Sequence, residues 1–266
     1  MNNRRWIRTG VVAFAGLGLG LAACGTEAGT GAEGPATSAP ADPKVVLVAA
    51  TEEIDKGNFK FDITGDEVSG GGQVHAPSRS AQLKMTFASE ALSMKIDMIF
   101  IEPDSWVKID LGQLAELPGA EALKSDKWMH VDQSKAKSLE DFSVDFDDID
   151  PAGAEKILAT ADGVQKTAEG TYTGKVDLSK ASDAGLVDEE VVKALGAQAT
   201  TLPFEAKVDA EGRLTTLKVE IPAAGETKAH SVQVTYSDYG AAGPAKKPAA
   251  SDVIEAPKNV YDILGG

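Results

Sequence analysis

Cysteine is almost absent from this chain of 266 residues, in which Cys24 is the only one. A single thiol cannot form an intrachain disulfide, and it cannot build a metal site from several cysteines. The three histidines, His75, His130 and His230, lie far apart in the sequence and do not predict a metal site either. We therefore expect a domain without metal or cofactor that is held by its own hydrophobic core, which is feasible at this length.

Catalytic signatures are also missing. The sequence contains no Gly-x-Ser-x-Gly elbow and no phosphate-binding loop. Ser134 and Lys137 match a Ser-x-x-Lys spacing, but no Lys-Thr-Gly or Ser-Asp-Asn motif accompanies them. The acidic run from Asp145 to Asp150 lacks the glycine and the terminal glutamate of an EF-hand loop, so we interpret it as a solvated loop that caps a helix. The sequence thus predicts a protein that is not an enzyme.

Basic residues are outnumbered, with 26 Lys and Arg against 41 Asp and Glu and a formal charge of −15. If residues 1–23 are removed, three arginines leave with them, and 23 basic against 41 acidic side chains give −18. Such a surface repels nucleic acid and anionic lipid headgroups. We therefore expect no nucleic-acid partner, and we expect any membrane attachment to come from a lipid anchor.

The apolar run from Val11 to Ala22 is shorter than the roughly 20 residues that a membrane-spanning helix needs. Arg4, Arg5 and Arg8 precede it without any acidic residue. A basic head, a short apolar run and small residues after it are typical of a signal peptide. We predict a signal peptide over residues 1–23.

The run closes with Leu21-Ala22-Ala23-Cys24, which resembles the lipobox of bacterial lipoproteins. The resemblance implies that the thiol of Cys24 receives diacylglycerol, that palmitate-type acyl chains anchor the protein, and that the chain is cut before this cysteine. It also implies a place on the extracytoplasmic face of the cell membrane. The alternative is an ordinary signal peptide with an incidental cysteine.

Residues 24–43 contain small and polar side chains, with prolines and glycines and no large apolar residue. Such a composition cannot bury a core and predicts a flexible tether. From residue 44 to residue 266 no composition shift marks a further boundary, so we expect one domain.

Beyond the tether, apolar residues alternate with polar ones at a period of two, as in strands with one buried and one wet face. Asp209 to Gly212 is a hairpin signal between two of these segments. The alternating apolar residues are Phe59, Phe61 and Ile63; Leu83, Met85 and Phe87; Leu92, Met94, Ile96, Met98 and Phe100; Val107, Ile109 and Leu111; Tyr172, Val176 and Leu178; Phe204, Ala206 and Val208; Leu217, Val219 and Ile221; and Val232, Val234 and Tyr236.

Four segments have a helical period instead. One carries Val45, Val48, Ala49 and Ile54; another carries Leu111, Leu114 and Leu117; a third begins at the cap Asp150-Pro151 and carries Ala154, Ile157, Leu158 and Ala161; the last carries Leu186, Val187, Val191 and Leu195 and stops at Gly196. The pattern predicts an α+β fold in which a few helices cover the apolar face of one antiparallel sheet. After a Pro/Gly-rich loop that follows Tyr239, we expect Ile254 to Pro257 and a short tail, which lies against an edge of this sheet.

The arrangement resembles the LppX/LprG-type lipoproteins of actinobacteria, which are similar to the LolA/LolB lipid carriers. The segments that carry the resemblance are Asn58 to Phe61, Asp104 to Lys108, Asp126 to Trp128, Gly170 to Asp177, Val208 to Leu214, Val234 to Gly240, and Ala256-Pro257. The resemblance implies a half-barrel sheet wrapped around helices, with an apolar cavity for the acyl chains of lipids or glycolipids. The chain departs from the family in its Ala/Gly/Pro loop at residues 240–250 and in its acidic charge.

Three methionines fall on apolar strand faces, and methionine suits surfaces that adapt to varied apolar partners. We expect the following residues to line the cavity: Met85, Phe87, Met94, Ile96, Met98, Phe100, Val107, Ile109, Leu158 and Phe204. The alternative is that they are sheet core beneath a helix. The matching functions are a lipid or glycolipid carrier, or a sensor with a filled core that contacts a membrane protein or the cell wall.

Overall fold

The computed structural model describes residues 41–88, 93–116, 125–132, 144–146, 149–225, 227–257 and 260–261. Predictions for the signal peptide, for Cys24 and for most of the tether lie outside the described residues, as do those for Leu92 and Leu117. From Ala41 onward, the described residues belong to one compact unit.

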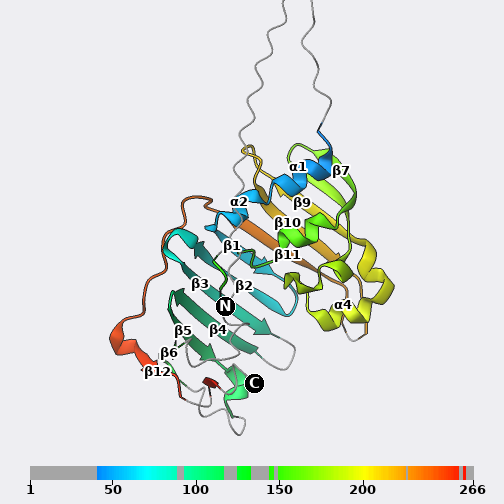
Figure 1. Cartoon of the computed structure of the whole chain (residues 1–266). Helices are drawn as coiled ribbons and strands as arrows, with labels where there is room; N and C mark the ends of the chain where they lie inside the picture. Colours follow the sequence, from blue (N-terminus) through cyan, green and yellow to red (C-terminus); the bar gives the residue numbers. More distant parts are fainter. Residues whose placement is uncertain are drawn as a thin grey trace, which may run out of the picture. The chain divides into compact units, whose positions relative to one another are not determined.

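Twelve strands form one open sheet in the order β12-β6-β5-β4-β3-β2-β1-β11-β10-β9-β8-β7 (Figure 1). Their bounds are β1 Asn58–Thr64, β2 Val68–His75, β3 Ser80–Ala88, β4 Ser93–Ile101, β5 Asp104–Asp110, β6 Trp128–Asp132, β7 Asp162–Ala168, β8 Thr171–Val176, β9 Leu202–Val208, β10 Leu214–Ile221, β11 His230–Ser237 and β12 Val253–Glu255. The alternating segments predicted from the sequence fall on these strands. Leu111 and Leu178 are exceptions, because Leu111 follows the end of β5 and Leu178 opens the short 3₁₀ helix η5 (Leu178–Lys180).

The sheet is dominated by antiparallel pairs, as predicted, and one pair at its edge is parallel. There β12 pairs with β6 in parallel, with Ile254 beside Met129 and Glu255 beside His130. A parallel pair arises because the chain returns to this edge through a long connection, from the end of β11, rather than through a tight turn. The prediction that the tail lies against a sheet edge is confirmed.

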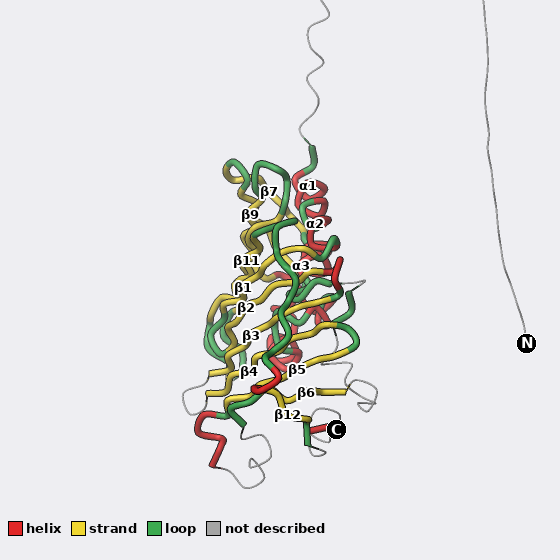
Figure 2. Tube along the Cα trace, turned by 90° about the vertical axis from the view of Figure 1, so that its left-hand side faces the viewer, coloured by secondary structure: helices red, strands yellow, loops and turns green. Residues whose placement is uncertain are grey.

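The helices are short, and α1, α2 and α3 lie along one side of the sheet (Figure 2). Their bounds are α1 Pro43–Ala49, α2 Glu52–Asp55, α3 Ala154–Ala159 and α4 Glu189–Leu195, and the remaining 3₁₀ helices are η1 Ala76–Ser78, η2 Gly112–Glu116, η6 Ser182–Ala184, η7 Gly196–Thr201 and η8 Ala250–Asp252. Leu47, Ile54, Ile157 and Leu158 point from α1, α2 and α3 into the main core and are 0% exposed. These side chains bury the inner face of the sheet around β1 and β8–β11.

Two helix predictions need correction. The segment at Leu111 and Leu114 forms the 3₁₀ helix η2 in its described part rather than an α-helix. Helix α3 begins after Gly153, not after Asp150, because Gly153 takes a φ of 57° and leaves no room for a side chain beside Ala184. The carboxylate of Asp150 nevertheless accepts hydrogen bonds from the backbone N–H groups of Ala152 and Glu155.

Candidate apolar binding site

The ten residues predicted to line a lipid pocket fall into two groups by exposure. Phe100, Val107, Ile109, Leu158 and Phe204 are buried, and none of them exceeds 8% exposure. The second group is only partly buried or exposed, and it consists of Met85, Phe87, Met94, Ile96 and Met98. Within this group Phe87 is 36% exposed, although it is a large aromatic residue on a strand.

Strand register brings the second group together on one face. Met85 lies opposite Ile96, and Phe87 lies opposite Met94, in the antiparallel pair of β3 with β4. Opposed residues in such a pair project from the same side of the sheet, so these side chains are neighbours. Leu83 lies opposite Met98 and extends the row. We call Leu83, Met85, Phe87, Met94, Ile96 and Met98 the methionine strip.

Leu83 was not among the predicted lining residues, although its alternation with Met85 was visible in the sequence. The neighbouring strand β2 places Gly72 opposite Leu83 and Gly70 opposite Met85, so it adds no side chain to this part of the face. A Cβ atom built on Gly70 would lie 2.7 Å from the sulfur of Met85. The thioether of Met85 therefore lies over the glycine, and nothing in the sequence pattern of β3 alone signals this contact.

Leu158 and Phe204 do not join the methionine strip. Leu158 is on α3, and Phe204 is on β9, which β10, β11, β1 and β2 separate from β3 in the sheet. Both belong to the main core cluster. The prediction placed ten side chains around one cavity, whereas the described structure distributes them between a packed core and a partly exposed strip.

On the β5 side, the strip adjoins a second hydrophobic cluster. Val107 lies opposite Met98, and Ile109 lies opposite Ile96. This cluster also contains Leu111, Met129, Val131 and Val260, and Met94, Ile96 and Met98 pack against it. The methionine strip thus lies between two cores and borders both of them.

The reverse face of the same strands carries charges. Lys84 lies opposite Asp97, and Asp97 lies opposite Lys108, so charges of alternating sign run across β3, β4 and β5. Such a face is compatible with water, whereas the methionine strip is apolar at three alternate positions on each of its two strands. The two faces therefore differ sharply in what they can bind.

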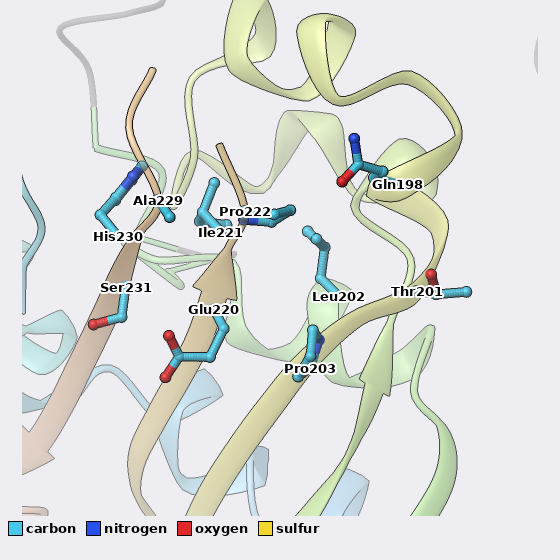
Figure 3. A pocket seen from close by; sticks show the side chains of 10 residues that line it. All are labelled: Gln198, Thr201, Leu202, Pro203, Glu220, Ile221, Pro222, Ala229, His230 and Ser231. Carbon is cyan, nitrogen blue, oxygen red and sulfur yellow. The ribbon is translucent and has the colours of Figure 1, made fainter. Parts of the chain in front are cut away.

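Three surface depressions in the described part of the chain are lined by other residues. One, of about 600 Å³, lies where β9, β10 and β11 meet η7, and Figure 3 shows the apolar side chains of Leu202, Ile221 and Pro222 in it with His230 and Glu220 nearby. Another, of about 580 Å³, is on the polar face of β1–β3, and a third, of about 500 Å³, is beside α1. The predicted lining residues contribute to none of these three.

Neither a metal centre nor a membrane span is found among the residues that the structure describes. No group of three or more His, Cys, Asp or Glu side chains in that part of the chain is arranged to hold a metal ion. No helix there is both long and apolar enough to cross a bilayer.

The fold and the site together define an α+β protein with an open, mostly antiparallel sheet that carries an apolar strip on one face. No protein-family model matches the chain, and no curated protein matches it. A crystal structure of DNA polymerase sliding clamp from Pseudomonas aeruginosa aligns at 11% identity and a TM-score of 0.12, over 79% of this chain and 63% of that chain. The chain thus spans less than two thirds of the clamp's length.

Proposed function

We propose that this protein is a lipoprotein that binds, and transfers, the acyl chains of a lipid or glycolipid at the methionine strip. The observation that carries the proposal is the gathering of Leu83, Met85, Phe87, Met94, Ile96 and Met98 on one face while remaining incompletely buried. Large apolar side chains that adjoin one another and stay accessible mark a surface for an apolar partner. The proposal includes no chemical step.

The chemistry of the strip suits a hydrocarbon chain. Methionine is unbranched and polarizable, so it adapts to ligands of different shape better than leucine or valine does. Burying a methylene group contributes about 0.8 kcal/mol, so a chain of about sixteen carbons gains on the order of 10 kcal/mol before ordering costs. This figure is the gain for a fully buried chain, and a chain covered on one side by the strip gains part of it.

The half-barrel of LolA-like carriers and the lipid anchor belong to the same proposal. The open sheet with helices on one side supports the half-barrel interpretation. The anchor rests on the sequence around Cys24, and with it the location on the extracytoplasmic face of the cell membrane. The formal charge of −15 supports attachment through acyl chains rather than through anionic headgroups.

A second candidate function has its own supporting observation. The inner face of β1 and β8–β11 is filled by side chains such as Leu158 and Phe204, at 0% and 3% exposure. A sheet filled in this way suits a sensor that offers its outer surfaces to a membrane protein or to the cell wall. Crosslinking in cells would return one specific partner in that case, and this capture would persist after the methionine strip is altered.

Lipid extraction of the purified full chain tests the first candidate. We expect mass spectrometry to find co-purifying lipid, and we expect a fluorescent fatty acid to displace it. In Met94→Lys, a charge in the middle of the strip should weaken binding of the fluorescent fatty acid by about tenfold or more, because burying an ion beside a hydrocarbon chain is unfavourable.

Val45→Lys is the matched control, since Val45 is 64% exposed on α1 and lies outside the strip. Val45→Lys should unfold at the same urea concentration as the unaltered protein, and fatty-acid binding by Met94→Lys is measured under urea-free conditions where denaturation shows that this variant is folded, because Met94 is partly buried. Equal fatty-acid binding by both variants would refute the assignment of the strip.

A further inference from the structure

The C-terminal segment crosses the end of the sheet beside the second hydrophobic cluster. We call its described residues, 253–257 and 260–261, the C-terminal strap. β12 contributes three residues that pair with β6, and the backbone N–H of Ala256 donates to the carbonyl oxygen of His130 at 3.0 Å. Figure 1 shows β12 beside β6 at the edge of the sheet. So short a pairing is held by few backbone hydrogen bonds.

The strap covers apolar surface. Val260 is 0% exposed and packs in one cluster with Met129, Val131 and Val107. Ala256 and Tyr261 pack against the same cluster, and so do Met94, Ile96 and Met98 of the methionine strip. The Tyr261 hydroxyl accepts a hydrogen bond from the backbone N–H of Asp132 at 3.0 Å. Removing the strap would therefore extend the apolar surface from the methionine strip onto β5 and β6.

One imidazole fastens the strap to the sheet. The Nε2 atom of His130 lies 2.8 Å from Oδ1 of Asp104 on β5, and its Nδ1 atom lies 3.2 Å from Oε1 of Glu255 in the strap. His130 is on β6, so its side chain joins two neighbouring elements. An imidazolium ion donates from both nitrogens, whereas a neutral imidazole donates from only one. The ring can therefore donate to both carboxylates at once only while it is protonated.

Other charged and titratable groups surround this bridge. The Nζ atom of Lys247 lies 3.9 Å from Oδ2 of Asp104 and 4.9 Å from the centre of the Trp106 ring. Trp106 lies 5.5 Å from the His130 ring, and Asp132 lies opposite Asp104 on β6. Burial lowers the pKa of His130, but the hydrogen bonds to Asp104 and Glu255 outweigh it and raise this pKa above 6.5.

The raised pKa of His130 determines the pH range over which the bridge stabilises the strap. A histidine whose pKa is raised by folding stabilises the bridge fully below about 6.5 and loses that contribution as the pH rises through the folded value.

We propose that the C-terminal strap is a detachable cover, which His130 fastens while it is protonated and which uncovers the β5–β6 end of the apolar surface when that proton leaves. The inference rests on the proposed function in one respect, namely that the uncovered surface enlarges the acyl-binding site. A short edge strand fastened by one titratable side chain opens locally at a smaller free energy than the whole sheet.

Amide hydrogen exchange of the full chain tests whether the strap opens. We expect the protection factors of residues 254–256 to fall by about fivefold between pH 5.5 and pH 8, while those of β10 stay constant. In Glu255→Gln and in His130→Gln, the low protection should already be present at pH 5.5. Glu190→Gln is the matched control, because Glu190 pairs with Lys193 on α4 and is as exposed as Glu255, at 81% against 75%.

Oxidation of Met129 by dilute peroxide provides a second readout that needs no lipid. Met129 is 0% exposed under the strap, so it should oxidise about fivefold faster at pH 8 than at pH 5.5, and fast at both values in Glu255→Gln. Met85 and Met94, which are already partly exposed, should change little. If the exchange at residues 254–256, or the oxidation rate of Met129, were the same at pH 5.5 and pH 8, the proposal that the strap detaches would be overturned.

Binding of the fluorescent fatty acid separates this inference from the proposed function. If the strap opens and binding of the fatty acid becomes stronger, the detachable strap and the proposed function are both supported. If the strap opens and no form of the protein binds the fatty acid, the proposed function fails and the detachable strap remains. If the fatty acid binds equally well with the strap open and closed, the role of the strap as a cover fails and the proposed function remains.

Discussion

At the scale of single residues, the contact between Tyr236 and Asp150 ties the sheet to the loop before α3. The Tyr236 hydroxyl donates to Oδ1 of Asp150 at 3.1 Å, and the backbone N–H of Glu155 donates to Oδ2 at 2.9 Å. Burial and the nearby Asp150 carboxylate raise the pKa of Tyr236 well above its ordinary value, so this hydroxyl keeps its proton. The ring of Tyr236 also packs edge-on against Phe59, 5.6 Å away.

Tyr236→Phe removes this donor and leaves the partly buried carboxylate of Asp150 with one partner fewer. We expect the free energy of unfolding to fall by about 1–2 kcal/mol, because this carboxylate loses a hydrogen bond. Tyr172→Phe is the control, since Tyr172 is 5% exposed and its hydroxyl makes no hydrogen bond within the described part of the chain. Urea denaturation measures both, and equal stability of the two variants would contradict this account.

The pKa of Asp150 leads to a prediction about pH. Burial raises this pKa above 3.8, and the hydrogen bonds to the carboxylate only partly oppose it. Because the folded value exceeds the unfolded value, ionising Asp150 destabilises the fold as the pH rises through this interval. Asp150→Asn does not titrate, so its stability relative to the unaltered protein should improve between pH 3.5 and pH 7. Urea denaturation measures the difference in the free energy of unfolding between Asp150→Asn and the unaltered protein. If this difference stays constant from pH 3.5 to pH 7, the raised pKa of Asp150 is contradicted.

The sequence predicts part of this network. The alternation around Tyr236 placed its ring on the inner face, and the Asp150-Pro151 pair indicated a helix start. The partnership between the two side chains was not predictable, because it joins residues 86 positions apart and depends on how α3 packs on the sheet. Local spacing carries no information about such a contact.

At the scale of elements, β2 shows where the sequence pattern fails. Its Gly70-Gly71-Gly72 run has no apolar alternation and low strand propensity, so the sequence gives no sign of a strand there. The strand nevertheless pairs with β1 and β3 along its length. Its neighbours impose the structure, since both have strong alternation. β7 was missed for a related reason, because Asp162–Ala168 is mostly polar and exposed at the sheet edge.

The close approach of β3 to Gly70 can be tested directly. In Gly70→Ala the new methyl group would meet the Met85 sulfur and the Lys84 carbonyl oxygen, so we expect a loss of about 1–3 kcal/mol in the free energy of unfolding. Ser69→Ala, on an exposed position of the same strand, should change stability by less than about 0.5 kcal/mol. A Gly70→Ala protein as stable as the unaltered one would show that β3 and β2 are less tightly packed than described.

At the scale of the whole molecule, alternation predicted which face of each strand is apolar but not how that face is covered. The predicted lining residues share the same pattern, yet Phe204 is buried beneath helices and Phe87 is 36% exposed. The difference comes from the order of strands in the sheet and from the positions of α1–α4, neither of which a period of two encodes. The parallel pairing of β12 with β6 could not be predicted either, because a strand of three residues is too short for its alternation to indicate which strand it pairs with.

The central claim is that acyl chains bind at the methionine strip, and methyl resonances of the methionines test it most directly. With ¹³C-methyl methionine in the full chain at pH 5.5, where the strap is fastened, we expect titration with palmitate to shift the signals of Met85, Met94 and Met98, and to shift that of buried Met129 least. If palmitate leaves the three strip signals unchanged at concentrations where it remains soluble, or shifts Met129 as much as the others, the claim is contradicted.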